Sequence, residues 1–316
     1  MLFPLSVRSR AILQALFVTF LWSTSWVLIK FGLQDIPPLT FAGLRYVLAF
    51  LVLLPIEIRR RRTRRNRPLQ RQDWVRLATL GLLYYTVAQG AQFVALWLLP
   101  AVTLSLLLNF TTVVVAFLGI LFLAERPGLL QWLGTALFIA GALAYFHEDL
   151  IESGIGRSAM ELLGFAVAAV GVLANAFSSV LGRGINRGHD ISPLTVTVIS
   201  MGIGSVALLA SGIGFQGLPS LKLSSWLIIA WLAVVNTALA FTVWNHSLRT
   251  LSAVESSIIN NTMMIQIAVL AWLFLGERLS GLQLGGLLLA ALGALTVQLR
   301  RSPILERAGA ETTELP

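Results

Sequence analysis

LFLAERPGLLQWLGTALFIAGAL (residues 121–143) recurs 152 positions later as LFLGERLSGLQLGGLLLAALGAL (residues 273–295). The two stretches align without a gap and share Leu-Phe-Leu, Glu-Arg, Leu-Gln and a terminal Gly-Ala-Leu. Each predicts the end of an apolar helix, a charged turn, and a second apolar helix with small residues on one side. Because two charges and an amide recur in one register, the match indicates an internal duplication.

The same offset continues upstream of the two quoted stretches. It pairs Ala101 with Ala253, Ser105 with Ser257, and Asn109 with Asn261. The repeated unit is therefore longer than one pair of helices.

The composition places the chain in the membrane. Of its 316 residues, 57% are hydrophobic and only 12% are charged, and the mean hydropathy is +0.82. A soluble protein would need more polar surface than this. The net charge of +9 is carried at the ends of hydrophobic runs, as membrane topology demands, so we expect no nucleic-acid partner. The chain has no Cys, which excludes thiol catalysis and thiolate metal sites.

Apolar runs between charge, Pro and Gly breaks predict an all-α integral membrane protein with ten transmembrane helices. The expected spans are residues 11–31, 39–58, 75–98, 102–123, 129–146, 161–181, 194–214, 226–246, 253–276 and 279–299.

The distribution of basic residues predicts the orientation. With both termini in the cytoplasm, 18 of the 23 Lys and Arg residues fall on the inner side and 5 on the outer side. Each repeat has five spans, an odd number, so the second repeat is expected to be inverted relative to the first. The predicted organisation is a cytoplasmic N-terminus at 1–10, a first repeat at 11–146, a periplasmic connector at 147–160, a second repeat at 161–300 and a cytoplasmic tail at 301–316.

An arginine-rich segment at residues 59–76 separates the second and third predicted spans. We expect it to be a loop that contacts anionic lipid on the cytoplasmic side. Binding to nucleic acid or a regulator is the less favoured alternative.

The chain resembles the drug/metabolite transporter (DMT) superfamily, specifically its ten-helix EamA-like branch. The resemblance rests on LWSTSWVLIKFGL at 21–33, IPPLTFAGLRY at 36–46, and LFLGERLSGLQLGG at 273–286 with its partner near Glu125. It implies a carrier of the bacterial inner membrane that exports or exchanges small organic solutes through a central cavity. The first copy departs from the pattern, because Ala124 and Pro127 stand where the second copy has Gly276 and Leu279.

Two asparagines are the best candidates for a substrate site. Asn109 and Asn261 lie about 13 Å into a core about 30 Å thick, near the midplane of equivalent helices. They could contact polar groups of the solute, or they could only join two helices by a hydrogen bond.

Further polar and aromatic positions at helical spacing extend this candidate site. The predicted substrate-binding residues are Trp22, Trp26, Tyr85, Gln89, Gln92, Asn109, Asn175, Asn261, Thr262 and Gln266. The two tryptophans predict an aromatic wall for an apolar or aromatic solute. Packing between helices is the alternative for each residue.

Three charged residues lie near the ends of predicted spans. Glu255 has no acidic counterpart in the first repeat and is a candidate for proton coupling, although a carboxylate at a helix N-terminus is also favoured by the helix dipole. Lys30 and Arg45 are expected to snorkel to the outer interface, unless an anionic substrate uses them.

The predicted function is secondary transport of small organic metabolites by alternating access, with amino acids or related solutes as the favoured substrates and drugs as further candidates. Antiport of a proton or of a second solute is the candidate for energy coupling. A channel and a membrane-embedded enzyme are the alternatives, but His147, His189 and His246 are dispersed and form no catalytic or metal spacing. We therefore expect no catalytic residues, no metal and no cofactor. Gly286, Ala290 and Ala294 predict close helix packing, either within the chain or between protomers.

Overall fold

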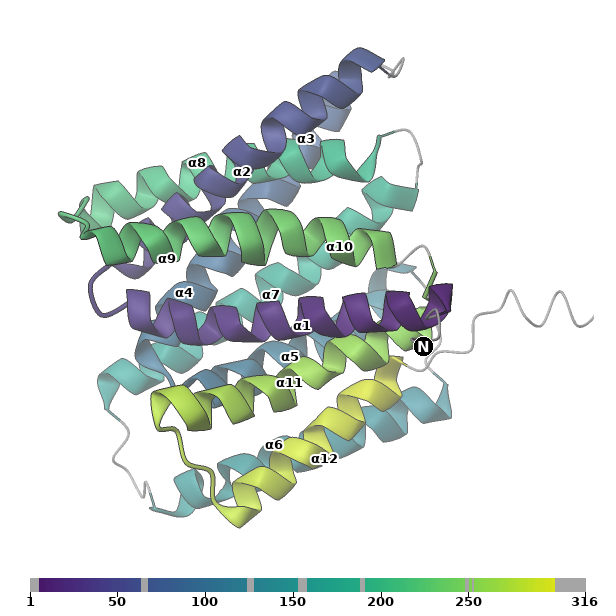
Figure 1. The fold of residues 1–316 in the computed structure, drawn as a ribbon. Coiled ribbons are helices and arrows are strands. Elements are labelled where there is room, and N and C mark those ends of the chain that lie inside the picture. Colours follow the sequence, from purple (N-terminus) through teal and green to yellow (C-terminus); the bar gives the residue numbers. More distant parts are fainter. Residues whose placement is uncertain are drawn as a thin grey trace, which may run out of the picture.

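The computed structural model describes residues 6–63, 68–123, 128–152, 158–187, 191–247, 250–251 and 253–298. Within these ranges the protein is all-helical and contains no strand. The helices run side by side as a bundle (Figure 1).

The first half of the chain forms α1 (Val7–Gly32), α2 (Pro38–Thr63), α3 (Arg71–Gly81), η1 (Leu82–Ala88), α4 (Gln89–Leu98), α5 (Ala101–Leu123) and α6 (Leu129–Glu152). The second half forms α7 (Ala159–Arg187), α8 (Pro193–Gln216), α9 (Leu223–Ala233), η2 (Val234–Leu239), α10 (Ala240–Ser247), α11 (Ala253–Leu275) and α12 (Gly281–Gln298). In the described residues, seven helices are long and apolar enough to cross a membrane, and two shorter ones are apolar. The chain is a multi-pass membrane protein.

Two expected connections are shorter than the sequence suggested. The helix α2 continues through Arg59–Arg62 and ends at Thr63, so the first part of the predicted 59–76 loop is helical. The predicted connector at 147–160 is also partly helical, because α6 extends to Glu152 and α7 begins at Ala159. In both places a helix continues beyond its apolar run, since polar residues such as Arg and Glu are good helix formers outside the hydrocarbon.

A π-helical segment interrupts one long helix in each half of the chain. The segment η1 begins at Leu82 and joins α3 to α4, while η2 begins at Val234 and joins α9 to α10. These starting points are 152 positions apart, which is the offset of the sequence repeat. The segments LLYYTVA and VVNTAL have little sequence in common, so the correspondence is visible only in the structure.

The second helix of the quoted stretch packs against its own copy, because α6 and α12 lie side by side (Figure 1). A Cβ atom added at Gly286 would lie 2.5 Å from the backbone N of Tyr145 and 2.7 Å from the carbonyl O of Gly141. At Gly134 it would lie 2.6 Å from the backbone N of Val297. The small residues thus form a close helix contact within the chain, which answers the question left open by the sequence.

The other helix contacts follow the same offset. Helix α1 packs on α11 and α10, and its counterpart α7 packs on α5 and α4. Helix α2 packs on its counterpart α8, where a Cβ atom on Gly43 would lie 2.5 Å from the Cα of Leu209. Exchanging the two halves of the chain therefore reproduces the main contacts.

The Glu-Arg pair of the second copy has a structural role that its position in a turn did not suggest. Gly276 has a φ of 70° and follows the last residue of α11. Beyond it, the carboxylate of Glu277 accepts hydrogen bonds from the backbone N–H groups of Ala101 and Val102, at 2.7 and 3.0 Å. Glu277 thereby caps the N-terminus of α5. Glu125, the matching residue of the first copy, lies outside the described residues.

We expect Glu277→Ala to lower the free energy of unfolding by about 1–2 kcal/mol, because two N–H groups at the start of α5 lose a charged acceptor. Unfolding in detergent by SDS titration measures this change. Arg278→Ala is the matched control, since its side chain is exposed. Equal effects of the two variants would contradict the capping role.

Candidate functional site

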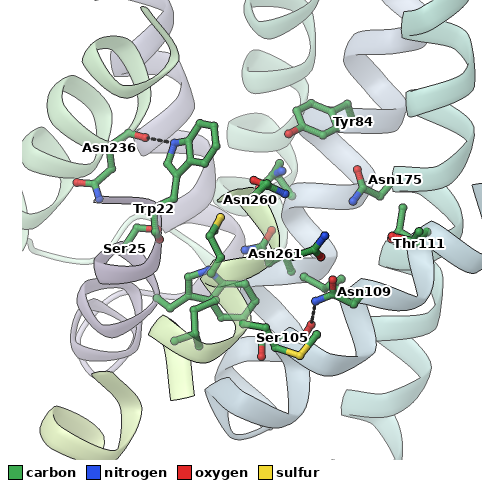
Figure 2. Close-up of a pocket in the computed structure, with 18 of the residues that line it drawn as sticks. Trp22, Ser25, Tyr84, Ser105, Asn109, Thr111, Asn175, Asn236, Asn260 and Asn261 are labelled. Carbon is green, nitrogen blue, oxygen red and sulfur yellow. Dashed lines mark hydrogen bonds between the residues drawn. The ribbon is translucent and has the colours of Figure 1, made fainter. Parts of the chain in front are cut away.

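A cavity of about 420 Å³ lies at the centre of the bundle. Residues from α1, α2, η1, α4, α5, α7, η2, α10 and α11 line it. Figure 2 shows asparagine side chains from α5, α7 and α11 around the cavity, and Trp22 on the α1 side. The lining is mixed, with amides and hydroxyls beside aromatic and aliphatic groups, as is common for small-molecule sites.

Seven of the ten predicted site residues line this cavity. They are Trp22, Trp26, Gln89, Gln92, Asn109, Asn175 and Asn261. Tyr85, Thr262 and Gln266 are not among the lining residues. Whether any of the seven binds a solute stays a prediction.

Tyr84 occupies the cavity wall where Tyr85 was expected. The prediction assumed α-helical spacing, but both tyrosines lie in η1. Hydrogen bonds of a π-helix run between residues five apart, so Tyr84 and Gln89 share a face there. Tyr85 is buried instead against Tyr84 and Tyr46, with ring centroids 4.9 and 5.4 Å away.

Gln266 and Thr262 belong to a polar cluster between α11 and α1. The Gln266 side chain accepts a hydrogen bond from Ser23 at 2.9 Å and donates one to Thr262 at 2.9 Å and one to Thr19 at 3.3 Å. Its amide oxygen and nitrogen are therefore satisfied by the protein, and the cluster joins the two helices.

The aromatic wall is held by a residue that the sequence analysis missed. The indole N–H of Trp22 donates to the carbonyl O of Asn236 at 3.1 Å, shown by a dashed line in Figure 2. The Asn236 side chain in turn donates to the carbonyl O of Leu21. Phe241 and Trp244 pack beside the Trp22 ring at centroid distances of 5.4 and 5.2 Å. An asparagine inside an apolar run was the available signal for Asn236.

Much of the cavity wall comes in pairs related by the offset of 152. The pairs are Tyr84 and Asn236, Gln89 and Phe241, Leu108 and Asn260, Asn109 and Asn261, Thr111 and Met263, and Thr112 and Met264. In the best-matched pair, Asn109 donates to the carbonyl O of Ser105 at 2.8 Å, which leaves its amide oxygen available on the cavity side. Equivalent positions of the two halves thus face one cavity.

Arg45 also lines the cavity, so the expectation that it snorkels to the interface is wrong. Its exposed fraction is only 6%. Nε and Nη2 donate to the hydroxyl of Thr237, both at 3.3 Å, and the guanidinium carbon lies 5.1 Å from the centroid of the Tyr46 ring. The sequence placed Arg45 near the end of a span, but the neighbouring η2 segment covers it.

Glu255 lies away from the cavity, at the start of α11. Its carboxylate accepts hydrogen bonds from Nε of Arg8 at 2.9 Å and from Nη2 of the same residue. The pair joins the first turn of α1 to α11. A role of Glu255 in proton coupling stays a prediction.

Among the described residues, no three His, Asp or Glu side chains are grouped as metal ligands. The described lining of the cavity contains no carboxylate. Its chemistry is that of a binding site, with amides, hydroxyls, aromatic rings and one guanidinium.

The model of the EamA-like transporter family matches residues 9–146 and again residues 162–299. The chain belongs to the EamA-like transporter family. This confirms the resemblance seen in the sequence and places the protein in the bacterial inner membrane as a multi-pass transporter.

Relatives within the EamA-like transporters carry related names. The chain is 27% identical to a protein of Escherichia coli strain K12 named "Probable amino-acid metabolite efflux pump", over 88% of this chain and 91% of that protein. A Salmonella typhimurium protein of the same name is 28% identical with the same coverage. The "Uncharacterized inner membrane transporter YedA" of Escherichia coli strain K12 is 27% identical, over 75% of this chain and 74% of that protein.

One solved crystal structure shares the EamA-like fold of this chain with a TM-score of 0.65. It is 19% identical in sequence, and the match covers 92% of this chain and 99% of that one. At this identity the match supports the arrangement of the helices and nothing finer.

Proposed function

We propose that the protein is a secondary transporter that exports or exchanges amino acids or related small organic solutes by alternating access. The solute occupies the central cavity. The two five-helix halves, inverted relative to each other and with both termini in the cytoplasm, rock about it to open each membrane face in turn.

The main support for this proposal is that equivalent positions of both halves line the cavity. Asn109 and Asn261 are the clearest pair. A site at the interface of inverted repeats can be reached from either side by the same motion. The paired helix contacts, the matching start points of η1 and η2, and the double match to the family model support the duplication. The names of the relatives support amino acids as the solute class.

Counterflow in proteoliposomes tests the proposal. Vesicles loaded with an unlabelled amino acid mixture should accumulate a labelled member of the mixture transiently, because a carrier exchanges solute across the membrane. A channel would only equilibrate the label, and a membrane-embedded enzyme would convert it. Empty liposomes are the control, and the absence of any exchange across the amino acid, nucleoside and sugar classes would overturn the proposal.

Alternating access predicts solute-dependent labelling of single cysteines, which the Cys-free chain makes simple to introduce. Ser25→Cys reports on the cavity, and Ile12→Cys reports on the cytoplasmic end of α1, where Ile12 packs against Ala11, Leu251 and Ile259. We expect a solute that shows counterflow to change the maleimide labelling rates of these two cysteines in opposite directions. Unchanged rates at both positions would contradict alternating access.

A further inference from the structure

One cation, Arg45, lies in the described lining of the cavity, and no described acidic side chain forms an ion pair with it. Resting on the proposed transport function, we infer that Arg45 binds a carboxylate group of the transported solute. The solute class is accordingly a monocarboxylate with an apolar or aromatic body.

Arg45 is the one charged side chain among the described residues that line the cavity. The groups that contact its guanidinium are neutral: the Thr237 hydroxyl at 3.3 Å and the rings of Tyr46 and Phe93, whose centroids lie 5.1 and 6.0 Å from the guanidinium carbon. Four other basic residues of the described chain form ion pairs with acidic side chains: Arg8 with Glu255, Arg60 and Arg61 with Glu57, and Lys222 with Asp35. Arg45 therefore differs from the arginines whose charge is balanced by a carboxylate of the protein.

A guanidinium carries five N–H donors in a planar fork, and the Thr237 hydroxyl occupies only two of them. A buried charge of this kind is costly unless it is paired, and a carboxylate can satisfy the fork with two parallel hydrogen bonds. The low dielectric strengthens that pairing. One monovalent cation balances one carboxylate, whereas a phosphate dianion would leave net negative charge in the cavity.

Arg45 has no counterpart among the cavity residues of the second half of the chain. The position 152 residues after Arg45 is Thr197, which does not line the cavity. Trp22 and Trp26 of α1 and Tyr46 of α2 also line the cavity, and their counterparts 152 positions later do not. The two halves of the chain therefore contribute unlike groups to the cavity wall, because the cation and these three aromatic rings have no counterparts in the lining.

Purified protein should distinguish solutes by their carboxylate in a thermal-shift titration. The probes are 3-phenylpropanoate and phenylalanine, which carry the carboxylate, against phenylalaninamide and 2-phenylethylamine, which lack it. The matched aliphatic set is 4-methylpentanoate and leucine against leucinamide. We expect the carboxylates of at least one set to raise the unfolding temperature and to inhibit counterflow, and the amides and amines to do neither. Stabilisation by phenyl phosphate alone, or by the amides and amines, would overturn the inference.

Arg45→Gln should weaken binding of the effective carboxylate by about 30-fold or more, the loss expected when one partner of a buried charge pair is removed. Lys222→Gln removes an exposed cation and is the control, with binding unchanged. Arg45→Lys keeps the charge but loses the fork, and it should bind with intermediate affinity, which provides a second test if Arg45→Gln does not fold. Full carboxylate affinity in folded Arg45→Gln would overturn the inference.

The two proposals fail in different ways. If counterflow occurs only with uncharged or cationic solutes, the transport function holds and the role of Arg45 is rejected. If carboxylates bind but no solute is exchanged, the role of Arg45 holds and the transport function is rejected.

Discussion

Gly286→Ala is expected to destabilise the protein by about 1–3 kcal/mol, near the upper end of that range, although it adds a single methyl group. The added Cβ would meet the backbone N of Tyr145 at 2.5 Å and the carbonyl O of Gly141 at 2.7 Å. Backbone atoms of a packed helix cannot rotate away as a flexible side chain can, so α6 and α12 must separate. Separation removes the dispersion contacts that hold helices together in lipid, where no hydrophobic driving force acts between them.

The chain offers a matched control for this experiment in the preceding residue. A Cβ atom at Gly285 meets nothing within 4 Å, and the residue is exposed. Gly285→Ala should therefore leave stability unchanged or raise it by up to about 1 kcal/mol, because alanine favours the helix. SDS-titration unfolding of both variants measures the difference. If they are equally stable, the close contact of α6 and α12 does not support the fold.

Glu57→Gln is expected to lower the free energy of unfolding by about 2 kcal/mol. The Glu57 side chain is 4% exposed, and its carboxylate accepts hydrogen bonds from Nε of Arg60 at 2.9 Å, from Nε of Arg61 at 2.8 Å and from the hydroxyl of Thr195. Arg60 also donates to Thr195 at 2.9 Å, so the cluster ties the end of α2 to the start of α8. Breaking a buried ion pair costs about 3–5 kcal/mol, and the partial exposure of both arginines reduces that cost here.

Asp35→Asn is the control for Glu57→Gln. Asp35 is half-exposed and pairs with Lys222 at 3.6 Å, so its loss should cost less than about 1 kcal/mol. SDS-titration unfolding at low and high salt compares the two. If both variants lose the same free energy of unfolding, the Glu57 cluster behaves as a surface ion pair. The same holds if high salt reduces the loss in Glu57→Gln as strongly as the loss in Asp35→Asn.

The family, the membrane location and seven of the residues that line the cavity could be predicted from the sequence. Hydropathy decides where a chain can lie in a bilayer, and polar residues inside apolar runs are too costly to face lipid, so Asn109, Asn175 and Asn261 were recognisable candidates. The register of the repeat pairs Asn109 with Asn261 from the sequence alone. Gln266 and Thr262 are also polar residues inside an apolar run, but the Gln266 amide forms its hydrogen bonds with Thr262 and with Thr19 of α1. A polar residue in an apolar run needs a hydrogen-bond partner, and the sequence does not say whether a solute or another helix supplies it.

Three features were decided only by tertiary structure. The π-helix η1 moved Tyr84 into the place expected for Tyr85, since its wider turn depends on packing and leaves little mark in composition. The burial of Arg45 depends on η2, which lies almost 200 positions later in the chain. Finally, the repeated stretch predicted a duplication by itself, but only the contact of α6 with α12 showed why its glycines recur: each copy supplies the backbone surface against which the other packs.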